Sequence, residues 1–189
     1  MPSSDTAPDV VKILISGGFG TGKTTMVGAI SEITPLRTEE RLTASSLHVD
    51  DLAGIEQKTT TTVALDFGRI TLTDDLVLYL FGTPGQQRFW FMWNDLAVGA
   101  LGGVVLVDTR RLDVSFAAVD FFEKREIPFV VAVNCFHGIQ RYSPEQIRAA
   151  LTLRPEVQLT MFDARDRRSC RDVLLGLLDH VIATVSAPA

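Results

Sequence analysis

The eight residues 17–24 constrain this chain more than any other segment. They read Gly-Gly-Phe-Gly-Thr-Gly-Lys-Thr and fit the pattern G-x-x-x-x-G-K-[ST]. Glycines in such a loop allow positive φ angles, so successive backbone N–H groups can point at phosphate oxygens. An apolar, β-branched run at residues 10–16 precedes the loop, and a helical pattern at residues 23–33 follows it. The segment therefore predicts a phosphate-binding loop between a buried strand and a helix.

The residue types in this loop suggest separate tasks in binding a nucleoside triphosphate. Lys23 would reach the β- and γ-phosphates, and the hydroxyl of Thr24 would coordinate Mg²⁺. The positive end of the following helix favours the same anionic groups. A glycine-rich turn can also be an ordinary connection, but the complete pattern in this context favours phosphate binding. The predicted phosphate-binding residues of the loop are Gly20, Thr21, Gly22, Lys23, Thr24 and Thr25.

The remainder of the chain alternates between strand-like and helix-like patterns. Further strands are predicted at residues 62–72, 76–81, 102–107, 129–133 and 157–162, and helices at 114–125, 144–151 and 171–185. The short polar join at residues 73–75 predicts an antiparallel hairpin, whereas the polar segment 34–58 predicts a loop. We therefore expect an α/β fold, a three-layer P-loop domain. Its six-stranded sheet would be mostly parallel, with one antiparallel hairpin strand and helices on both faces.

Composition limits the domain organisation and the possible partners. A chain of 189 residues with 46% hydrophobic residues can form one packed domain, expected at residues 10–189 after a flexible tail at residues 1–9. The net charge of −5 argues against a nucleic-acid partner. The cysteines Cys135 and Cys170 lack metal-site spacing, so we expect a cytoplasmic protein. Without a signal peptide, a long apolar stretch or a C-terminal cysteine, we expect no direct membrane anchor, and recruitment to the inner membrane face only through partners.

Two later segments provide further motifs that can be compared with those of known families. Four threonines at residues 59–62 are followed by Val-Ala-Leu-Asp-Phe, and the strand at residues 76–81 is followed by Gly-Thr-Pro-Gly-Gln at residues 82–86. With the loop, these motifs resemble the Ras-like small GTPases over about residues 10–185. The resemblance is closest to the bacterial branch that includes MglA and the GTPase of the conservon systems.

This resemblance implies roles for the two segments. Thr62 would be the switch threonine that senses Mg²⁺ and the γ-phosphate, with Thr61 or Thr60 as alternatives; otherwise the threonines merely begin a strand. Gly85 would give its N–H to the γ-phosphate, and Gln86 would orient the attacking water as the catalytic residue.

Other positions depart from the family pattern and point to slow hydrolysis. Gly82 replaces the aspartate that in relatives holds a Mg²⁺-bound water, so weaker Mg²⁺ affinity is expected. Phe19 replaces a glycine, and its ring could block an arginine finger supplied in trans or displace Gln86. Thr61 stands where some MglA-like proteins carry an internal arginine finger, so none is evident here.

The base-binding motifs of the family are altered as well. Residues 134–137 read Asn-Cys-Phe-His, where relatives have N-K-x-D, and residues 163–165 read Asp-Ala-Arg, where relatives have S-A-K. The resemblance assigns Asn134 and His137 to the first motif. It also implies that Ala164 donates its N–H to guanine O6 and that Arg165 lies across the base. Neutral imidazole offers one acceptor rather than two, so weaker guanine specificity is expected. Alternatively, His137 is a solvent-facing loop residue.

The segment at residues 89–93, Phe-Trp-Phe-Met-Trp, carries consecutive large apolar residues. A helix cannot turn all of them to one face, so some must pack in the core. The others would form a lid over the nucleotide or a surface for a partner. We favour a partner that contacts Trp90, Phe91 and Trp93. By resemblance, that partner would be a roadblock-fold, MglB-like protein.

These observations together predict a switch that binds GTP or GDP with Mg²⁺. It would hydrolyse GTP slowly to GDP and phosphate, and signal through shape changes at about residues 34–62 and 82–97. The alternative is a pseudo-GTPase scaffold that binds nucleotide without significant hydrolysis. An ATP-dependent phosphotransferase is disfavoured, because no separate substrate-binding insertion or arginine-rich lid is evident.

Overall fold

The computed structural model describes residues 7–42, 61–138 and 140–186, with the backbone alone at residues 37–42, 61–64, 137 and 186. The strands are β1 (Asp9–Gly17), β2 (Leu36–Leu42), β3 (Thr61–Thr73), β4 (Leu76–Gly82), β5 (Ala100–Val107), β6 (Phe129–Asn134) and β7 (Leu159–Phe162). The helices are α1 (Lys23–Ile30), α2 (Trp93–Ala97), α3 (Phe116–Lys124), α4 (Pro144–Ala150) and α5 (Arg167–Ser186). Short 3₁₀ turns are η1 (Gln87–Met92), η2 (Leu112–Ser115) and η3 (Phe136–Gly138). The predicted tail at residues 1–9 lies mostly outside the described residues.

The described strands form one sheet in the order β2-β3-β4-β1-β5-β6-β7. β3 runs antiparallel to both of its neighbours, while β4, β1, β5, β6 and β7 pair in parallel. The predicted fold class, with its antiparallel hairpin strand, is confirmed.

The sheet has seven strands rather than the expected six, because residues 36–42 form β2 instead of belonging to a loop. Residues 61–65 of the 13-residue β3 extend beyond β4, and the first half of β3 pairs with this segment, from Leu36 opposite Phe67 to Leu42 opposite Thr61. The sequence of β2 is mostly polar and charged and lacks the alternation typical of a strand. Its pairing depends on backbone hydrogen bonds, which the side-chain pattern does not predict.

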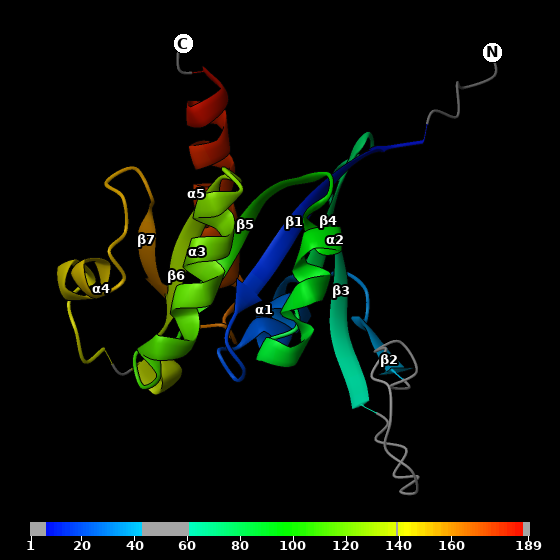
Figure 1. Cartoon of the computed structure of the whole chain (residues 1–189). Coiled ribbons are helices and arrows are strands. Elements are labelled where there is room, and N and C mark those ends of the chain that lie inside the picture. The colour runs from blue at the N-terminus through cyan, green and yellow to red at the C-terminus, as the bar shows by residue number, and fades with distance from the viewer. Residues whose placement is uncertain (1–6, 43–60, 139, 187–189) are drawn as a thin grey trace, which may run out of the picture.

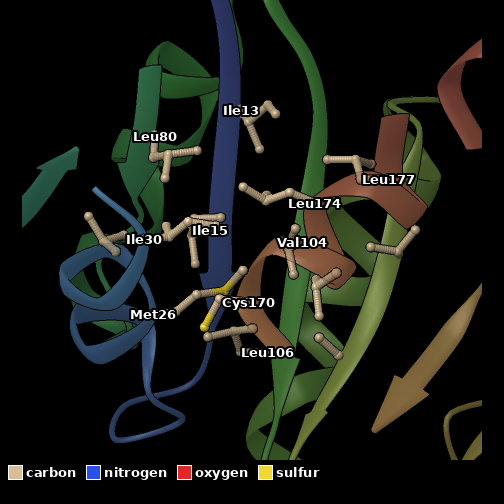
Figure 2. Close-up of a cluster of buried hydrophobic side chains, with 14 of the residues drawn as sticks. Ile13, Ile15, Met26, Ile30, Leu80, Val104, Leu106, Cys170, Leu174 and Leu177 are labelled. Atoms are coloured by element: carbon tan, nitrogen blue, oxygen red, sulfur yellow. The ribbon is translucent and has the colours of Figure 1, made fainter. Parts of the chain in front are cut away.

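Helices cover both faces of the sheet (Figure 1). α1 and α5 pack on one face, and α2, α3 and α4 contribute to the core on the other face. The central strands β1, β5 and β6 are buried on both faces, which explains their nearly continuous apolar sequences. Figure 2 shows the core beneath α1 and α5, where labelled side chains from β1, β4 and β5 meet those of the two helices; these are Ile13, Ile15, Met26, Ile30, Leu80, Val104, Leu106, Cys170, Leu174 and Leu177.

Local sequence signals account for several helix boundaries. α4 begins with a capping box: the Ser143 hydroxyl accepts from the Gln146 N–H, and the Gln146 side chain accepts from the Ser143 N–H. α5 begins at Arg167, earlier than predicted, because the Asp166 carboxylate accepts from the N–H groups of Arg168 and Ser169. Within the described residues, no helix is both long and apolar enough to cross a membrane.

Candidate nucleotide-binding site

A cavity of about 340 Å³ opens beside the loop that joins β1 to α1. It lies at the carboxyl ends of β1 and β4. In the sheet order, β2, β3 and β4 lie on one side of β1, and β5, β6 and β7 lie on the other, so the order of strands reverses at β1. Such a switch point is the usual ligand site of an α/β sheet. The lining residues are Phe19, Gly20, Gly22, Lys23, Thr24, Thr25, Asp66, Thr83, Pro84, Gly85, Gln86, Phe89 and Phe136. The structure thus brings together most of the predicted phosphate-binding residues and the predicted catalytic Gln86.

The glycines of the loop adopt the conformations for which glycine is suited. Gly17, Gly20 and Gly22 have φ angles of 136°, 79° and 106°. At Gly22, a Cβ would also lie 2.5 Å from Nδ2 of Asn134, so the loop could not approach that side chain as closely with any other residue. Thr21 is buried, and its hydroxyl donates to the Gly18 carbonyl over 3.0 Å, which closes the loop on itself.

Lys23 lies against the inside of the loop. Its Nζ donates to the carbonyls of Gly17 and Gly18 over 2.8 and 2.7 Å. Burial lowers the pKa of Lys23 to about 8, and the charge of Asp66 partly opposes that shift. The ammonium is therefore still mostly charged at neutral pH, and it faces a cavity of a size that suits phosphate groups.

Gly85 completes the phosphate side of the cavity from the opposite wall. A Cβ at Gly85 would lie 2.7 Å from Lys23 Nζ and 2.8 Å from the backbone nitrogen of Phe19, so this close approach requires glycine. The segment is fixed by the Thr83 N–H, which donates to the Ile15 carbonyl, and by the Thr83 hydroxyl, which donates to Ser16 Oγ. Gln86 accepts a hydrogen bond from Arg88 through its side-chain oxygen over 2.8 Å.

A carboxylate that we did not predict lies beside the phosphate loop. Asp66 on β3 is 7% exposed, and its Oδ2 accepts a hydrogen bond from the Thr24 hydroxyl over 2.5 Å. It lies directly opposite Gly82 in the β3–β4 pairing. From the family pattern, we expected the carboxylate near Mg²⁺ to come from position 82 at the end of β4, where this chain has glycine. The available signal was the aspartate that follows Val-Ala-Leu in a strand otherwise suited to the core.

The predicted switch residue Thr62 lies at the start of β3, where it pairs with Arg41 of β2. Thr62 lies four positions before Asp66, which is about 13 Å along an extended strand. In this conformation the backbone does not bring Thr62 to Thr24, and contact with a metal there would require the start of β3 to move. The alternative residue Thr60 lies outside the described residues.

The apolar segment at residues 89–93 divides between core and surface. Phe89 and Trp93 are buried, at 5% and 3% exposed, and Trp93 Nε1 donates to the Pro84 carbonyl over 3.0 Å. Trp93 is therefore a core residue that supports the Gln86 loop, which corrects its prediction as a partner contact. Phe91 is 62% exposed and Trp90 is half-buried, so these two candidates remain accessible. The expectation that some members of this segment pack in the core is confirmed.

The base side of the site is organised by Asn134 at the end of β6. This side chain is 5% exposed; its Nδ2 donates to the Thr21 carbonyl over 3.0 Å, and its Oδ1 accepts from the Ala164 N–H over 3.2 Å. Asn134 thereby joins the phosphate loop to the segment after β7. The Ala164 N–H was expected to face guanine O6, but in this structure it is used by Asn134. The His137 backbone belongs to η3, and its side chain lies outside the described part of the structure.

Charged and aromatic groups flank this end of the cavity. Arg165 is half exposed and pairs with Asp163 through Nε and a terminal nitrogen, over 3.0 and 2.7 Å. Phe136 lines the cavity, with the Arg110 guanidinium 4.1 Å from the centre of its ring. Phe136 was within the predicted motif but had no assigned role, because its position over the cavity depends on η3.

Arg110 is itself held by Asp108, which follows β5. Burial favours the neutral acid, but the hydrogen bonds and charge of Arg110 outweigh it and lower the pKa of Asp108. This ion pair fixes the guanidinium over the Phe136 ring and so stabilises the base-side rim.

Comparisons with known proteins agree with the fold. A family model described as "Conserved hypothetical ATP binding protein" matches residues 15–184. The uncharacterized protein MJ1339 of Methanocaldococcus jannaschii is 29% identical over 128 residues, which cover 67% of this chain and 70% of that protein.

Among solved structures, the apo cytosolic domain of the T. maritima iron transporter FeoB superposes with a TM-score of 0.62 at 11% identity, covering 92% of this chain and 64% of that one. The G domain of the same protein gives 0.56 at 12% identity, with 94% and 100% covered. A GDP form of the cytosolic domain gives 0.60 at 11% identity, with 93% and 65% covered. The chain thus spans just under two thirds of the FeoB cytosolic domain, and at these identities the likeness concerns the fold.

Proposed function

Because the chain belongs to the family described as conserved hypothetical ATP binding proteins, we propose that the cavity binds a purine nucleoside triphosphate and its diphosphate with Mg²⁺. One observation carries this proposal. Lys23, Thr24 and Gly85, from two separate segments, converge on one cavity with the positive-φ glycines of the loop. Anion binding by such a loop at a helix N-terminus follows from its exposed N–H groups.

We propose guanine as the preferred base, in keeping with the resemblance to Ras-like and MglA-like GTPases. The support is Asn134, which joins the phosphate loop to the Ala164 segment as a framework for the base. Adenine, the base in the family's description, is the competing candidate. The wrong base would leave buried polar groups of the site without hydrogen-bond partners. The site should therefore bind one of the two purines clearly more tightly than the other.

Competition for a fluorescent GDP analogue tests this choice. GTP and GDP should displace the analogue at about tenfold lower concentrations than ATP, ADP or XTP, equivalent to about 1.4 kcal/mol. The variant His137→Asp should increase the preference for guanine, since a carboxylate offers two acceptors. Displacement by ATP at equal or lower concentrations would show that the base assignment is wrong, while leaving phosphate binding in place.

We further propose that the protein is a slow GTPase switch. Phe19 is 63% exposed at the cavity, beside the segment that carries Gln86. An exposed ring at this position would obstruct an arginine finger, which contributes about 10³–10⁵ in rate where one is present. In single-turnover assays with excess Mg²⁺, hydrolysis should be slow, and Phe19→Gly should leave room for a finger supplied in trans. Rapid unaided hydrolysis by the native chain would contradict the steric argument.

A pseudo-GTPase scaffold is the second candidate, favoured by the same Phe19 and by Gly82. Gln86→Ala separates the two. A slow GTPase should lose most of its residual turnover in this variant, whereas a scaffold would show the same background in both proteins.

We propose that the partner is a roadblock-fold, MglB-like protein that contacts Phe91 and Trp90. We also propose that the protein is cytoplasmic and is recruited to a membrane only through partners. The supporting observation is that Phe91 is exposed and lies in η1, which begins at the residue after Gln86. The affinity of a partner bound there could therefore depend on the bound nucleotide. Calorimetric titration with a purified roadblock-fold protein from the same genome tests this. Binding should depend on the bound nucleotide and be weakened by Phe91→Ser, but not by Val98→Ser, whose side chain is also exposed.

A further inference from the structure

We infer that Asp66 supplies, from β3, the metal-directed carboxylate that β4 lacks at Gly82. Asp66 would hold the Thr24 hydroxyl as a Mg²⁺ ligand and accept a hydrogen bond from one of the ion's water ligands. This inference rests on the proposed function, since the ion would be bound together with nucleotide phosphates.

The first argument is the geometry around Gly82. Asp66 and Gly82 are opposite each other in the antiparallel pair. A Cβ at Gly82 would lie 3.1 Å from Asp66 Cβ and 3.3 Å from its Oδ2, and its three nearest neighbours would all be Asp66 atoms. A side chain at position 82 and the Asp66 carboxylate therefore compete for one space. With glycine at position 82, the Asp66 carboxylate keeps this position without the shift that an added Cβ would require.

The second argument is the direction of the hydrogen bond between Thr24 and Asp66. The Thr24 hydroxyl donates its proton to Oδ2, so its lone pairs are left for a cation. An ionised carboxylate that orients a ligand in this way has the usual role of a group behind the metal's own ligands. Both residues line the cavity that also contains Lys23 and Gly85.

The third argument is the chemistry of the donor set. Mg²⁺ prefers oxygen ligands, keeps several waters, and is commonly bound by one or two carboxylates plus substrate phosphates. One hydroxyl and one buried carboxylate beside the phosphate loop satisfy that requirement. A buried carboxylate is costly without nearby positive charge, and Lys23 and the proposed ion would both supply it.

This arrangement has a consequence for the switch. β3 continues from Asp66 back to Thr62 and is paired there with β2. The carboxylate beside the metal would therefore belong to the same strand as the proposed switch threonine. Binding and loss of the ion would therefore act on β3, through Asp66, rather than on β4.

The test measures how Mg²⁺ controls release of a fluorescent GDP analogue, independently of hydrolysis. In the native chain, EDTA should speed release, and added Mg²⁺ should slow it again with a defined half-effective concentration. Asp66→Asn should raise that concentration about 10–100-fold, the usual loss for a group behind a metal ligand. The matched control is Glu123→Gln, which also neutralises a carboxylate that is mostly covered, but on α3 and outside the cavity lining, and should leave the concentration unchanged.

A relocation variant distinguishes a metal role from a merely structural one. Asp66→Gly combined with Gly82→Asp moves the carboxylate from β3 to β4, and removal of the Asp66 side chain clears the space that the new one needs. Recovery of Mg²⁺ control in the double variant, with loss in Asp66→Gly alone, would support the inference. An unchanged Mg²⁺ requirement in folded Asp66→Asn, as judged by circular dichroism, would overturn it.

A second measurement uses the native chain, so that a folding defect in the variants cannot obscure the result. An anomalous-difference map of crystals grown with Mn²⁺ and GDP should place the ion beside Thr24, within reach of Asp66 through one water. An ion farther away would overturn the inference. If the native chain bound no nucleotide even with Mg²⁺, the proposed function itself would fail; nucleotide binding with unaltered Mg²⁺ control in Asp66→Asn would refute Asp66 alone.

Discussion

At the scale of single residues, the partly buried Lys23 and the buried Asn134 show how polar side chains prepare the cavity for an anion. Lys23 has two loop carbonyls as acceptors. Asn134 has one donor and one acceptor satisfied, by segments far apart in the chain. Both side chains therefore have the hydrogen-bond partners that polar groups removed from water require. Their hydrogen bonds keep the loop in one conformation before phosphate binds.

The lowered pKa of Lys23, about 8, predicts that nucleotide binding weakens at alkaline pH. Above that pH the free protein loses the ammonium charge, whereas bound phosphates favour the charged form and raise the pKa again. Binding in EDTA should therefore take up close to one proton at pH 9 and almost none at pH 7. Calorimetry in two buffers of different ionisation enthalpy measures this uptake, and Lys23→Met should abolish it. Equal uptake at both pH values would contradict the assignment.

At the scale of elements, the strand pair β2–β3 and the turn η1 include much of the two segments proposed to change shape with the nucleotide, at about residues 34–62 and 82–97. β2 is an edge strand, bonded to β3 alone among the described strands. β3 links it to the phosphate loop through Asp66 and Thr24. On the other wall, Trp93 anchors the segment before η1 by its bond to Pro84, while Phe91 stays exposed.

If Thr62 reaches the metal in the triphosphate state, its pairing with Arg41 must open. Hydrogen exchange should then show lost protection in residues 36–42 with a non-hydrolysable GTP analogue relative to GDP. Residues 129–134 of the buried strand β6 should serve as an internal reference with unchanged protection. Identical exchange of β2 in both states would show that Thr62 is not the switch threonine.

At the scale of the whole molecule, two hydrophobic cores on opposite faces of the sheet hold the site in place. Phe122 of α3 is fully buried, and the α3 face lies so close to β5 that a Cβ at Gly103 would be 2.2 Å from the Phe122 ring. The parallel strands β1 and β4 end at the cavity, and Phe136 reaches it just after β6, so stability and binding share one framework.

Truncation of this core should be costly. Phe122→Ala should lower the free energy of unfolding by about 3–5 kcal/mol, through lost burial and the cavity left behind. The same change at the exposed Phe91 should alter it by about 0.5 kcal/mol or less. Urea denaturation of both variants measures the difference. Similar losses at the two positions would mean that the environment of Phe91 differs from the one described.

The sequence by itself determined the phosphate loop, the alternation of strands and helices, the fold class and the capping box of α4. Each depends on residues close together in the chain, where glycine φ preferences, hydrophobic period and cap chemistry act locally. Through the resemblance to Ras-like GTPases it also implied that Asn134 and the segment at residues 82–86 belong to one site.

Tertiary structure alone decided the pairing of β2, the inward turn of Trp93, the use of the Ala164 N–H by Asn134, and the place of Asp66 opposite Gly82. These features depend on register and packing between segments distant in sequence, and a shift of one residue in β3 would turn Asp66 to the other face. The phosphate loop could therefore be recognised from its own residues, whereas the carboxylate beside Thr24 could be found only after β3 and β4 were paired.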